Sequence, residues 1–199
     1  MSKEKSQAEI EIEALADVFN IATTGFDEFY KAAKEKDKGN YSTAASSGNS
    51  STAASSGYYS KAASSGDSST AASSGDYSTA ASSGNSSKAA SSGDYSKAAS
   101  SGNSSKAASS GYSSMAASSG DYSMAASSGY CSKAACDTNG FACVAGVGGC
   151  AKGKDGSALS VGYKDSAGRN RIAVGYVGEN GVKADTWYRA NKDGELEAQ

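Results

Sequence analysis

Few residues of this chain are suited to chemistry, and their spacing argues against most kinds of active site. The 199 residues include no histidine, and they show no pairing of carboxylates and no nucleophile with a base beside it. General acid–base and nucleophilic catalysis both depend on such positioned groups. Serine is abundant, but a serine without an activating base is only a polar side chain. The sequence therefore predicts a protein that is not an enzyme.

Four cysteines lie near one another, at gaps of five, seven and seven residues: Cys131, Cys136, Cys143 and Cys150. A zinc site usually has closely spaced pairs of ligands, often with histidine among them. Cys131 and Cys136 stand where other repeats carry serine or tyrosine, as size-matched substitutions would. We expect structural thiols. A disulfide in an oxidising compartment and metal ligation are the alternatives.

Two further motifs resemble known ion or phosphate sites without completing them. Gly148, Gly153 and Lys154 have the spacing of a phosphate-binding loop, but Asp155 stands where that loop needs Ser or Thr to hold magnesium. A nine-residue glycine period also occurs in calcium-binding β-rolls, whose repeats carry an aspartate. Here only four repeats have one at the second position: Asp67, Asp76, Asp94 and Asp121. We predict no phosphate loop, no calcium column, no metal site and no cofactor.

Residues 39–137 consist of eleven tandem repeats of nine residues. Positions one, four, six and seven are always Gly, Ser, Ala and Ala, whereas variation is concentrated at positions two, three and five. A composition rich in serine and glycine favours disorder on its own. A strictly fixed period is instead the signature of a repeat architecture. We therefore predict an all-β parallel solenoid over residues 39–137.

The alternation of side chains along a strand assigns the repeat positions to faces. Positions four and six are predicted to point inward and positions three and five outward, with Ala-Ser-Ser-Gly forming the corner. Position three alternates between tyrosine and serine, which indicates two nonapeptides, or eighteen residues, per coil. Like residues then stack on one face. The predicted binding surface is this stack with two lysines of position five: Tyr41, Tyr59, Tyr77, Tyr95, Lys61 and Lys97.

The flanking segments have the patterns of caps for the open ends of a solenoid. Residues 1–38 predict two amphipathic helices, of which the first covers 4–22. We expect them to form a cap or a homo-oligomer contact; a DNA-binding helix-turn-helix is the alternative, which the acidic first helix disfavours. Residues 138–199 predict a C-terminal β cap, a small antiparallel sheet that plugs the solenoid. Its expected strands are 157–163, 171–177 and 182–188, the last including Trp187.

Charge and hydropathy exclude several partners. The formal net charge is -2, so the chain lacks the strongly basic face of a nucleic-acid binder. No window approaches the eighteen apolar residues of a membrane span. The first residues contain no apolar core of a signal peptide. These features predict neither a nucleic-acid partner nor a membrane partner, and a cytosolic or virion location.

The repeat Ala-Ala-Ser-Ser-Gly-Asp-Tyr-Ser-Lys and the segment Val182-Lys183-Ala184-Asp185-Thr186-Trp187-Tyr188 together resemble a group of phage and prophage proteins of gut bacteria. Those proteins carry tandem A-x-S-G-x-x-S-x-A repeats and end in a similar K-A-D-T-W-Y strand. The resemblance covers about residues 39 to 190. It implies a location in the cytoplasm of an infected bacterium, or in a virion. Longer members of the group have an additional N-terminal domain.

These features lead to a functional hypothesis with two alternatives. We expect a non-enzymatic, phage-encoded protein whose rigid surface docks on a host protein or protein complex, for example to inhibit a bacterial defence enzyme. Tyrosine suits such a surface because it brings a large contact area at low entropic cost. The alternatives are an ice-binding solenoid and a structural or adhesive fibre element of a virion. A tyrosine ladder that merely stabilises the sheet would account for the same pattern.

Overall fold

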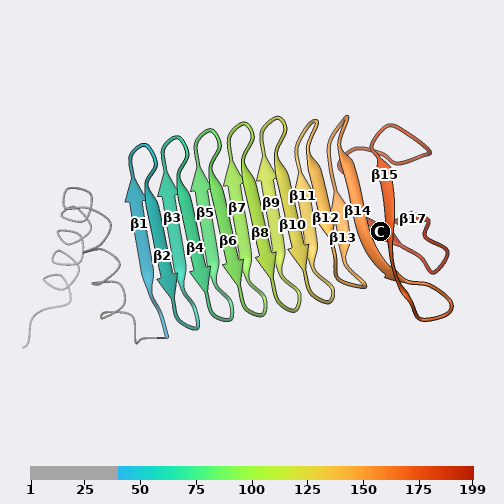
Figure 1. The fold of residues 1–199 in the computed structure, drawn as a ribbon, viewed down its shortest axis with the longest axis horizontal. Coiled ribbons are helices and arrows are strands. Elements are labelled where there is room, and N and C mark those ends of the chain that lie inside the picture. The colour runs from blue at the N-terminus through green and yellow to red at the C-terminus, as the bar shows by residue number, and fades with distance from the viewer. Residues whose placement is uncertain (1–39) are drawn as a thin grey trace, which may run out of the picture.

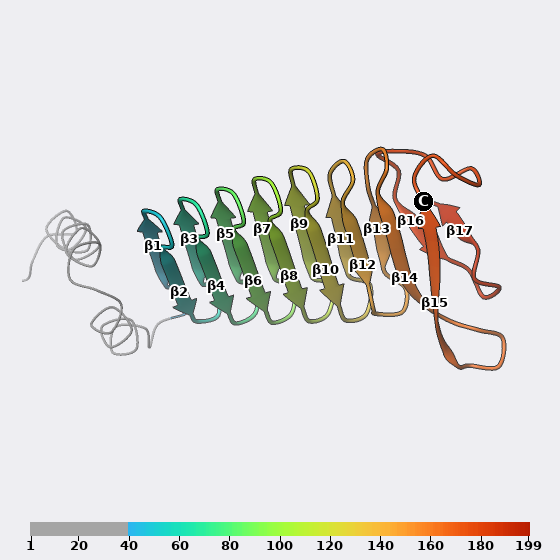
Figure 2. The same ribbon diagram turned by 45° about the horizontal axis from the view of Figure 1, so that its top comes forward.

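The computed structural model describes residues 40–199 as an all-β solenoid of about seven turns. Two long sheets face each other as walls, and the chain passes from one wall to the other at every corner (Figure 1; the same arrangement is seen from a second angle in Figure 2). The helices expected within residues 1–38 lie outside the described residues.

Strands β1 to β14 enter the two walls alternately, and the last three strands extend these walls. The odd wall is a nine-stranded sheet in the order β1 (Thr43–Ser47), β3 (Lys61–Ser65), β5 (Thr79–Ser83), β7 (Lys97–Ser101), β9 (Met115–Ser119), β11 (Lys133–Cys136), β13 (Cys150–Lys152), β16 (Tyr188–Ala190) and β17 (Leu196–Ala198). The even wall is an eight-stranded sheet in the order β2 (Thr52–Ser56), β4 (Thr70–Ser74), β6 (Lys88–Ser92), β8 (Lys106–Ser110), β10 (Met124–Ser128), β12 (Phe141–Val144), β14 (Ala158–Lys164) and β15 (Asn170–Tyr176). Strands β1–β14 all pair in parallel within their own wall.

The register confirms the predicted coil of eighteen residues. Thr43 is aligned with Lys61, and Lys61 with Thr79, so every residue lies beside its equivalent two repeats further on. The nine-residue period ends at Asp137, yet the parallel ladder continues through β12, β13 and β14. In these last turns the coil is one residue shorter, since Met124 is aligned with Phe141.

The interior holds only small side chains over most of its length. The alanines of position six are buried, and Ala53, Ala71 and Ala80 are wholly so. The serines of position four are also buried from Ser60 onward, which confirms the prediction that positions four and six point inward. Position eight is buried as well, as at Ser64 and Ser73, so positions five, seven and nine form the outer face of each wall.

Buried serine hydroxyls join the two walls. Ser60, just before β3, has its hydroxyl 2.7 Å from that of Ser73 in β4, and it donates to the Ser74 carbonyl at 2.8 Å. The same contact recurs along the solenoid, for example between Ser69 and Ser82. Burying an unpaired hydroxyl costs free energy. Because these hydroxyls pair with one another and with backbone carbonyls, serine can occupy the interior beside alanine.

The predicted corner is wrong: Ala-Ser-Ser is the end of each strand, and the corner is formed by positions one to four. In the corner from Gly75 to Ser78, the Ser78 N–H donates to the Gly75 carbonyl at 3.2 Å. Position three takes a left-handed backbone in most repeats, with φ of 59° at Tyr77, but not at Tyr41 or Tyr59. Position three therefore lies at the corner and not on the flat face shared by position five. Periodicity did not reveal this, because a glycine can begin a turn as readily as end one.

Glycine at position one is required by the close approach of successive rungs. A Cβ built on Gly84 would lie 2.4 Å from the carbonyl oxygen of Gly66, one coil earlier. The backbone there has φ of 117°, which side-chain-bearing residues rarely adopt. Both constraints explain why this position never varies in the repeats.

The C-terminal end has a conventional hydrophobic core. Leu159, Val161 and Val144 are fully buried, and Val182 and Tyr188 pack with them. Antiparallel strands follow the solenoid as predicted, but they extend the existing walls: β15 pairs with β14, and β16 pairs with β13. The strand expected over 182–188 is mostly a loop, in which the Lys183 N–H donates to the Tyr188 hydroxyl at 2.7 Å.

Candidate binding surface

The four predicted tyrosines form a stack at the corners that lead into the odd wall. Ring centroids lie 5.1 Å apart between Tyr41 and Tyr59, 5.2 Å between Tyr59 and Tyr77, and 5.1 Å between Tyr77 and Tyr95. Their spacing follows that of neighbouring strands in a sheet, roughly 4.8 Å. All four rings are substantially exposed, from 38% at Tyr59 to 77% at Tyr41. The predicted stacking is confirmed, and its role in binding stays a prediction.

Three further tyrosines, which the sequence interpretation missed, complete this row. Tyr58 packs edge-on against Tyr59 with centroids 4.7 Å apart. Tyr112 continues the row 6.2 Å from Tyr95, and Tyr130 stacks 5.6 Å from Tyr112. They occupy position two of repeats whose strands belong to the odd wall. Because the repeats alternate between the two walls, the sequence could have placed these tyrosines beside those of position three. We call these seven residues the tyrosine edge: Tyr41, Tyr58, Tyr59, Tyr77, Tyr95, Tyr112 and Tyr130.

Aspartates hold the corners of the tyrosine edge at a fixed spacing. The Asp76 carboxylate accepts the Asp94 N–H at 3.1 Å, and the Asp94 carboxylate accepts the Tyr112 N–H at 2.9 Å. Partial burial raises the pKa of the Tyr58 phenol above its ordinary value, and the charges of Tyr59, Tyr77 and Asp76 raise it further. The Asp76 and Asp94 carboxylates of the edge are therefore engaged with backbone N–H groups.

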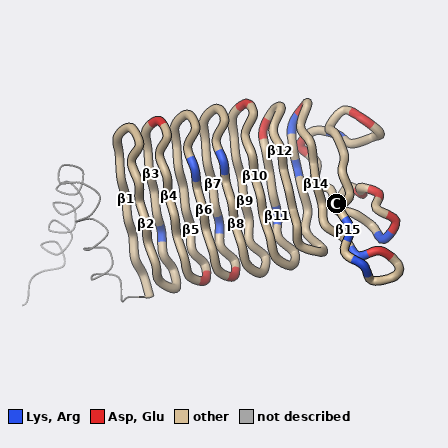
Figure 3. Tube along the Cα trace, viewed as in Figure 1, with Lys and Arg blue, Asp and Glu red and all other residues tan. Residues whose placement is uncertain are grey.

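The two predicted lysines lie on the outer face of the odd wall, beside the tyrosine edge. Lys61 in β3 and Lys97 in β7 are exposed, and Thr79 of β5 lies between them in the register. Within residues 40–199 no ion pair includes either lysine. Figure 3 shows that charges are sparse along the repeats and denser near the C-terminal end. Both ammonium groups are thus available to a partner.

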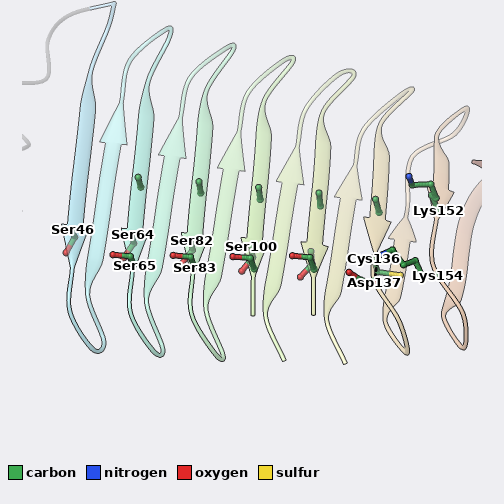
Figure 4. A pocket seen from close by; sticks show the side chains of 18 of the residues that line it. Ser46, Ser64, Ser65, Ser82, Ser83, Ser100, Cys136, Asp137, Lys152 and Lys154 are labelled. Carbon is green, nitrogen blue, oxygen red and sulfur yellow. Dashed lines mark ion pairs between the residues drawn. The ribbon is translucent and has the colours of Figure 1, made fainter. Parts of the chain in front are cut away.

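A shallow groove follows the same wall on the side away from the tyrosine edge. It encloses about 840 Å³, and small outward side chains of positions seven and nine line it in successive rungs (Figure 4). Its columns contain Ala45, Ala63, Ala81, Ala99 and Ala117 beside Ser47, Ser65, Ser83, Ser101 and Ser119. The sequence interpretation placed these residues in a corner and so missed the groove. The even wall has a counterpart of about 690 Å³.

Charged residues close the C-terminal end of the odd-wall groove. The Lys154 ammonium lies 2.9 Å from the Asp137 carboxylate, which lowers the pKa of that carboxyl; the Thr138 N–H, donating to it, lowers it further. Lys152 lies 3.8 Å from Asp185. The ammonium nitrogens of Lys133 and Lys152 lie 5.3 and 5.5 Å from the Trp187 ring centroid, within range of a cation–π interaction.

The cysteines are free thiols, and they do not converge on one point. Cys136 and Cys150 are buried, whereas Cys131 and Cys143 are partly exposed. Burial raises the pKa of the Cys136 thiol above its usual value, which lowers its reactivity at neutral pH. In the part of the chain from residue 40 onward, no group of three or more Cys, Asp or Glu side chains is arranged to hold a metal ion.

Comparison of this chain with known protein families, curated proteins and solved structures gives no match. Residues 40–199 contain no helix that is long and apolar enough to cross a membrane.

Proposed function

We propose that this chain is a non-catalytic binding protein that docks a host protein on the tyrosine edge and the adjoining odd wall. The observation that carries the proposal is the continuous row of seven exposed tyrosine rings, with neighbouring centroids 4.7 to 6.2 Å apart, beside Lys61 and Lys97. The resemblance to phage and prophage proteins favours a bacterial partner, for example a defence enzyme that the solenoid inhibits inside an infected cell.

Rigidity supports this proposal. Each stacked ring is restrained by its neighbours, so binding would cost little side-chain entropy. Tyrosine and arginine dominate the energetic centres of protein interfaces, and a neighbouring column with lysines adds electrostatic steering. Tyr122, which lies at the opposite corner, has no ring partner in the described residues. The aromatic row is therefore confined to one edge.

The repeat itself supplies a mild variant for the test. Serine is the natural alternative to tyrosine at position three, and Ser68 and Ser86 adopt the same left-handed backbone as Tyr77 and Tyr95. The triple variant Tyr59→Ser, Tyr77→Ser, Tyr95→Ser introduces a residue that the repeat already carries at this position, and circular dichroism checks that it remains folded. The control is Tyr122→Ser, which removes a more exposed ring from the other edge. Tagged proteins would be used to capture partners from bacterial lysate, with bound proteins quantified by mass spectrometry.

We expect at least one bacterial protein to be enriched by the wild-type chain and the Tyr122→Ser control, and to be lost with the triple variant. A second variant, Lys61→Thr with Lys97→Thr, should weaken the same capture most at low salt, since the lost steering is screened by ions. Thr43 and Thr79 are the natural residues of that column. The proposal is wrong if the tyrosine variant and its control recover the same proteins in the same amounts.

Ice binding is the second candidate, and the flat columns of alanine and serine on both walls favour it. Thr52 and Thr70 are aligned on the even wall, as an ice-binding array would need. Lys88 and Lys106 then interrupt that column. Thermal hysteresis measured on purified protein distinguishes the two candidates: a freezing-point gap supports ice binding, and its absence leaves the protein-binding proposal.

A further inference from the structure

The last strand of the even wall presents an exposed apolar stripe. Strand β15 lies at the C-terminal end of that wall and pairs with β14 alone (Figure 1). Ile172, Val174 and Tyr176 point to the outer face and are 67%, 56% and 53% exposed. Large apolar side chains on an open edge strand are rare in monomeric proteins, because such an edge pairs readily with a strand of another chain.

The backbone of the same three residues faces away from β14. The Val177 N–H donates to the Ser157 carbonyl at 2.9 Å, and the Asp165 N–H donates to the Arg169 carbonyl at 3.0 Å, at the two ends of the antiparallel ladder. Residues alternate in such a ladder between facing the partner strand and facing away. The groups of Ile172, Val174 and Tyr176 therefore point outward. Within residues 40–199 the one backbone bond to them is from the Glu179 N–H to the Tyr176 carbonyl.

We propose that two copies of this chain form a dimer by antiparallel pairing of their β15 strands about a two-fold axis at Val174. Val174 then faces Val174 of the second copy, and Ile172 faces Tyr176 of the second copy. All these positions have outward backbone groups, so the register satisfies hydrogen bonds and aligns apolar side chains on one face. A two-fold contact of this kind is self-complementary, and it joins the even walls of two solenoids into one sheet.

Charge favours the antiparallel direction over the parallel one. Arg169 lies just before β15 and Arg171 near its start, and both guanidinium groups are exposed although they contact Asp165. Glu179 lies in the exposed turn after the strand, without an ion pair in the described residues. Antiparallel pairing brings the basic end of one strand beside the acidic turn of the other. Parallel pairing would instead place like charges together.

The test is sedimentation equilibrium of the full chain and of Val174→Lys. We expect a reversible dimer for the wild type, and a dissociation constant raised at least about tenfold by the variant, because two ammonium groups would meet at the axis. Thr70→Lys is the matched control. It adds the same charge to the outer face of the same wall, where Lys88 already occurs in register, and should leave the dimer intact. Circular dichroism checks that each variant remains folded.

Glu179→Lys tests the direction of pairing without changing the strand. It should weaken the dimer several-fold at low salt and less at high salt, as screening removes the attraction. A wild-type chain that is monomeric at about 100 μM overturns the proposal, since such an interface would be too weak to be specific. A dimer that persists undiminished in Val174→Lys also overturns it and assigns the contact to another surface. An unchanged dimer in Glu179→Lys overturns the antiparallel register.

Discussion

The hydroxyl of Ser78, which leads into the odd wall, lies 2.8 Å from the hydroxyl of Ser91 on the even wall. Both side chains are buried, and Ser78 also donates to the Ser92 carbonyl at 3.0 Å. Ser78→Ala would remove both contacts, while the Ser92 carbonyl keeps the Gly75 N–H and the Ser91 hydroxyl keeps the Ser78 backbone carbonyl as its acceptor. We expect the free energy of unfolding to fall by about 0.5–1.5 kcal/mol, measured by urea denaturation. Ser83→Ala, an exposed serine of β5, is the control and should change it by less than about 0.5 kcal/mol.

Two glycines separate backbone strain from steric clash. Gly84 and Gly48 have similar φ values, 117° and 121°, but a Cβ on Gly84 would meet the Gly66 carbonyl, whereas a Cβ on Gly48 meets no atom of residues 40–199 within 4 Å. Strain alone should cost each alanine variant about 1–3 kcal/mol. We expect Gly84→Ala to lose clearly more stability than Gly48→Ala in thermal unfolding. Equal losses would show that the rungs part easily to admit a methyl group.

Stacking should make the tyrosine edge a source of stability as well as a surface. Tyr77 has close rings on both sides, Tyr59 and Tyr95, whereas Tyr122 has none in the described residues. Each aromatic pair contributes about 0.5–1.5 kcal/mol. Tyr77→Ser should therefore lower the free energy of unfolding by one to two such increments, and Tyr122→Ser should leave it nearly unchanged. Similar effects of both variants in chemical denaturation would mean that the rings touch without mutual stabilisation.

Acid should weaken the groove end through Asp137. Its pKa in the folded chain is lowered, first by Lys154 and then by the Thr138 N–H, so its stabilising contribution is present above the pKa of an unfolded aspartate, about 3.9. That contribution is lost as the pH falls through the lower, folded value. We expect Asp137→Asn to destabilise the chain at pH 7 and to approach wild-type stability at the most acid pH where both fold.

Lys154→Met removes the main cause of this shift and should reduce the slope of stability against pH in the acid range. Lys164→Met is the matched control, because Lys164 has no ion pair in the described part of the chain. Unfolding midpoints of both variants across the acid range distinguish the outcomes. A slope that stays the same in Lys154→Met would assign the acid sensitivity to another carboxylate, such as Asp165.

The sequence alone was enough to predict the solenoid, its coil of eighteen residues and the inward face of positions four and six. This follows from strict repetition, because identical units that stack must place identical side chains in register, and alternation of Tyr59 with Ser68 marks the two walls. The stack from Tyr41 to Tyr95 follows from the same reasoning. No tertiary detail is needed for such features, since each depends only on the period.

Tertiary structure decided what lies outside the period. The left-handed turn at Tyr77 moved the corner, because the choice between two glycine-containing turns depends on how neighbouring rungs pack against Gly75. Because the corner lies at positions one to four, the alanine and serine columns line a groove on the wall. For the same reason Tyr58, Tyr112 and Tyr130 lie in the tyrosine edge. The final strands extend the two walls, because the sheet edges at the end of the solenoid are open to pairing. Periodicity fixes which residues repeat, and packing between rungs fixes where the chain turns.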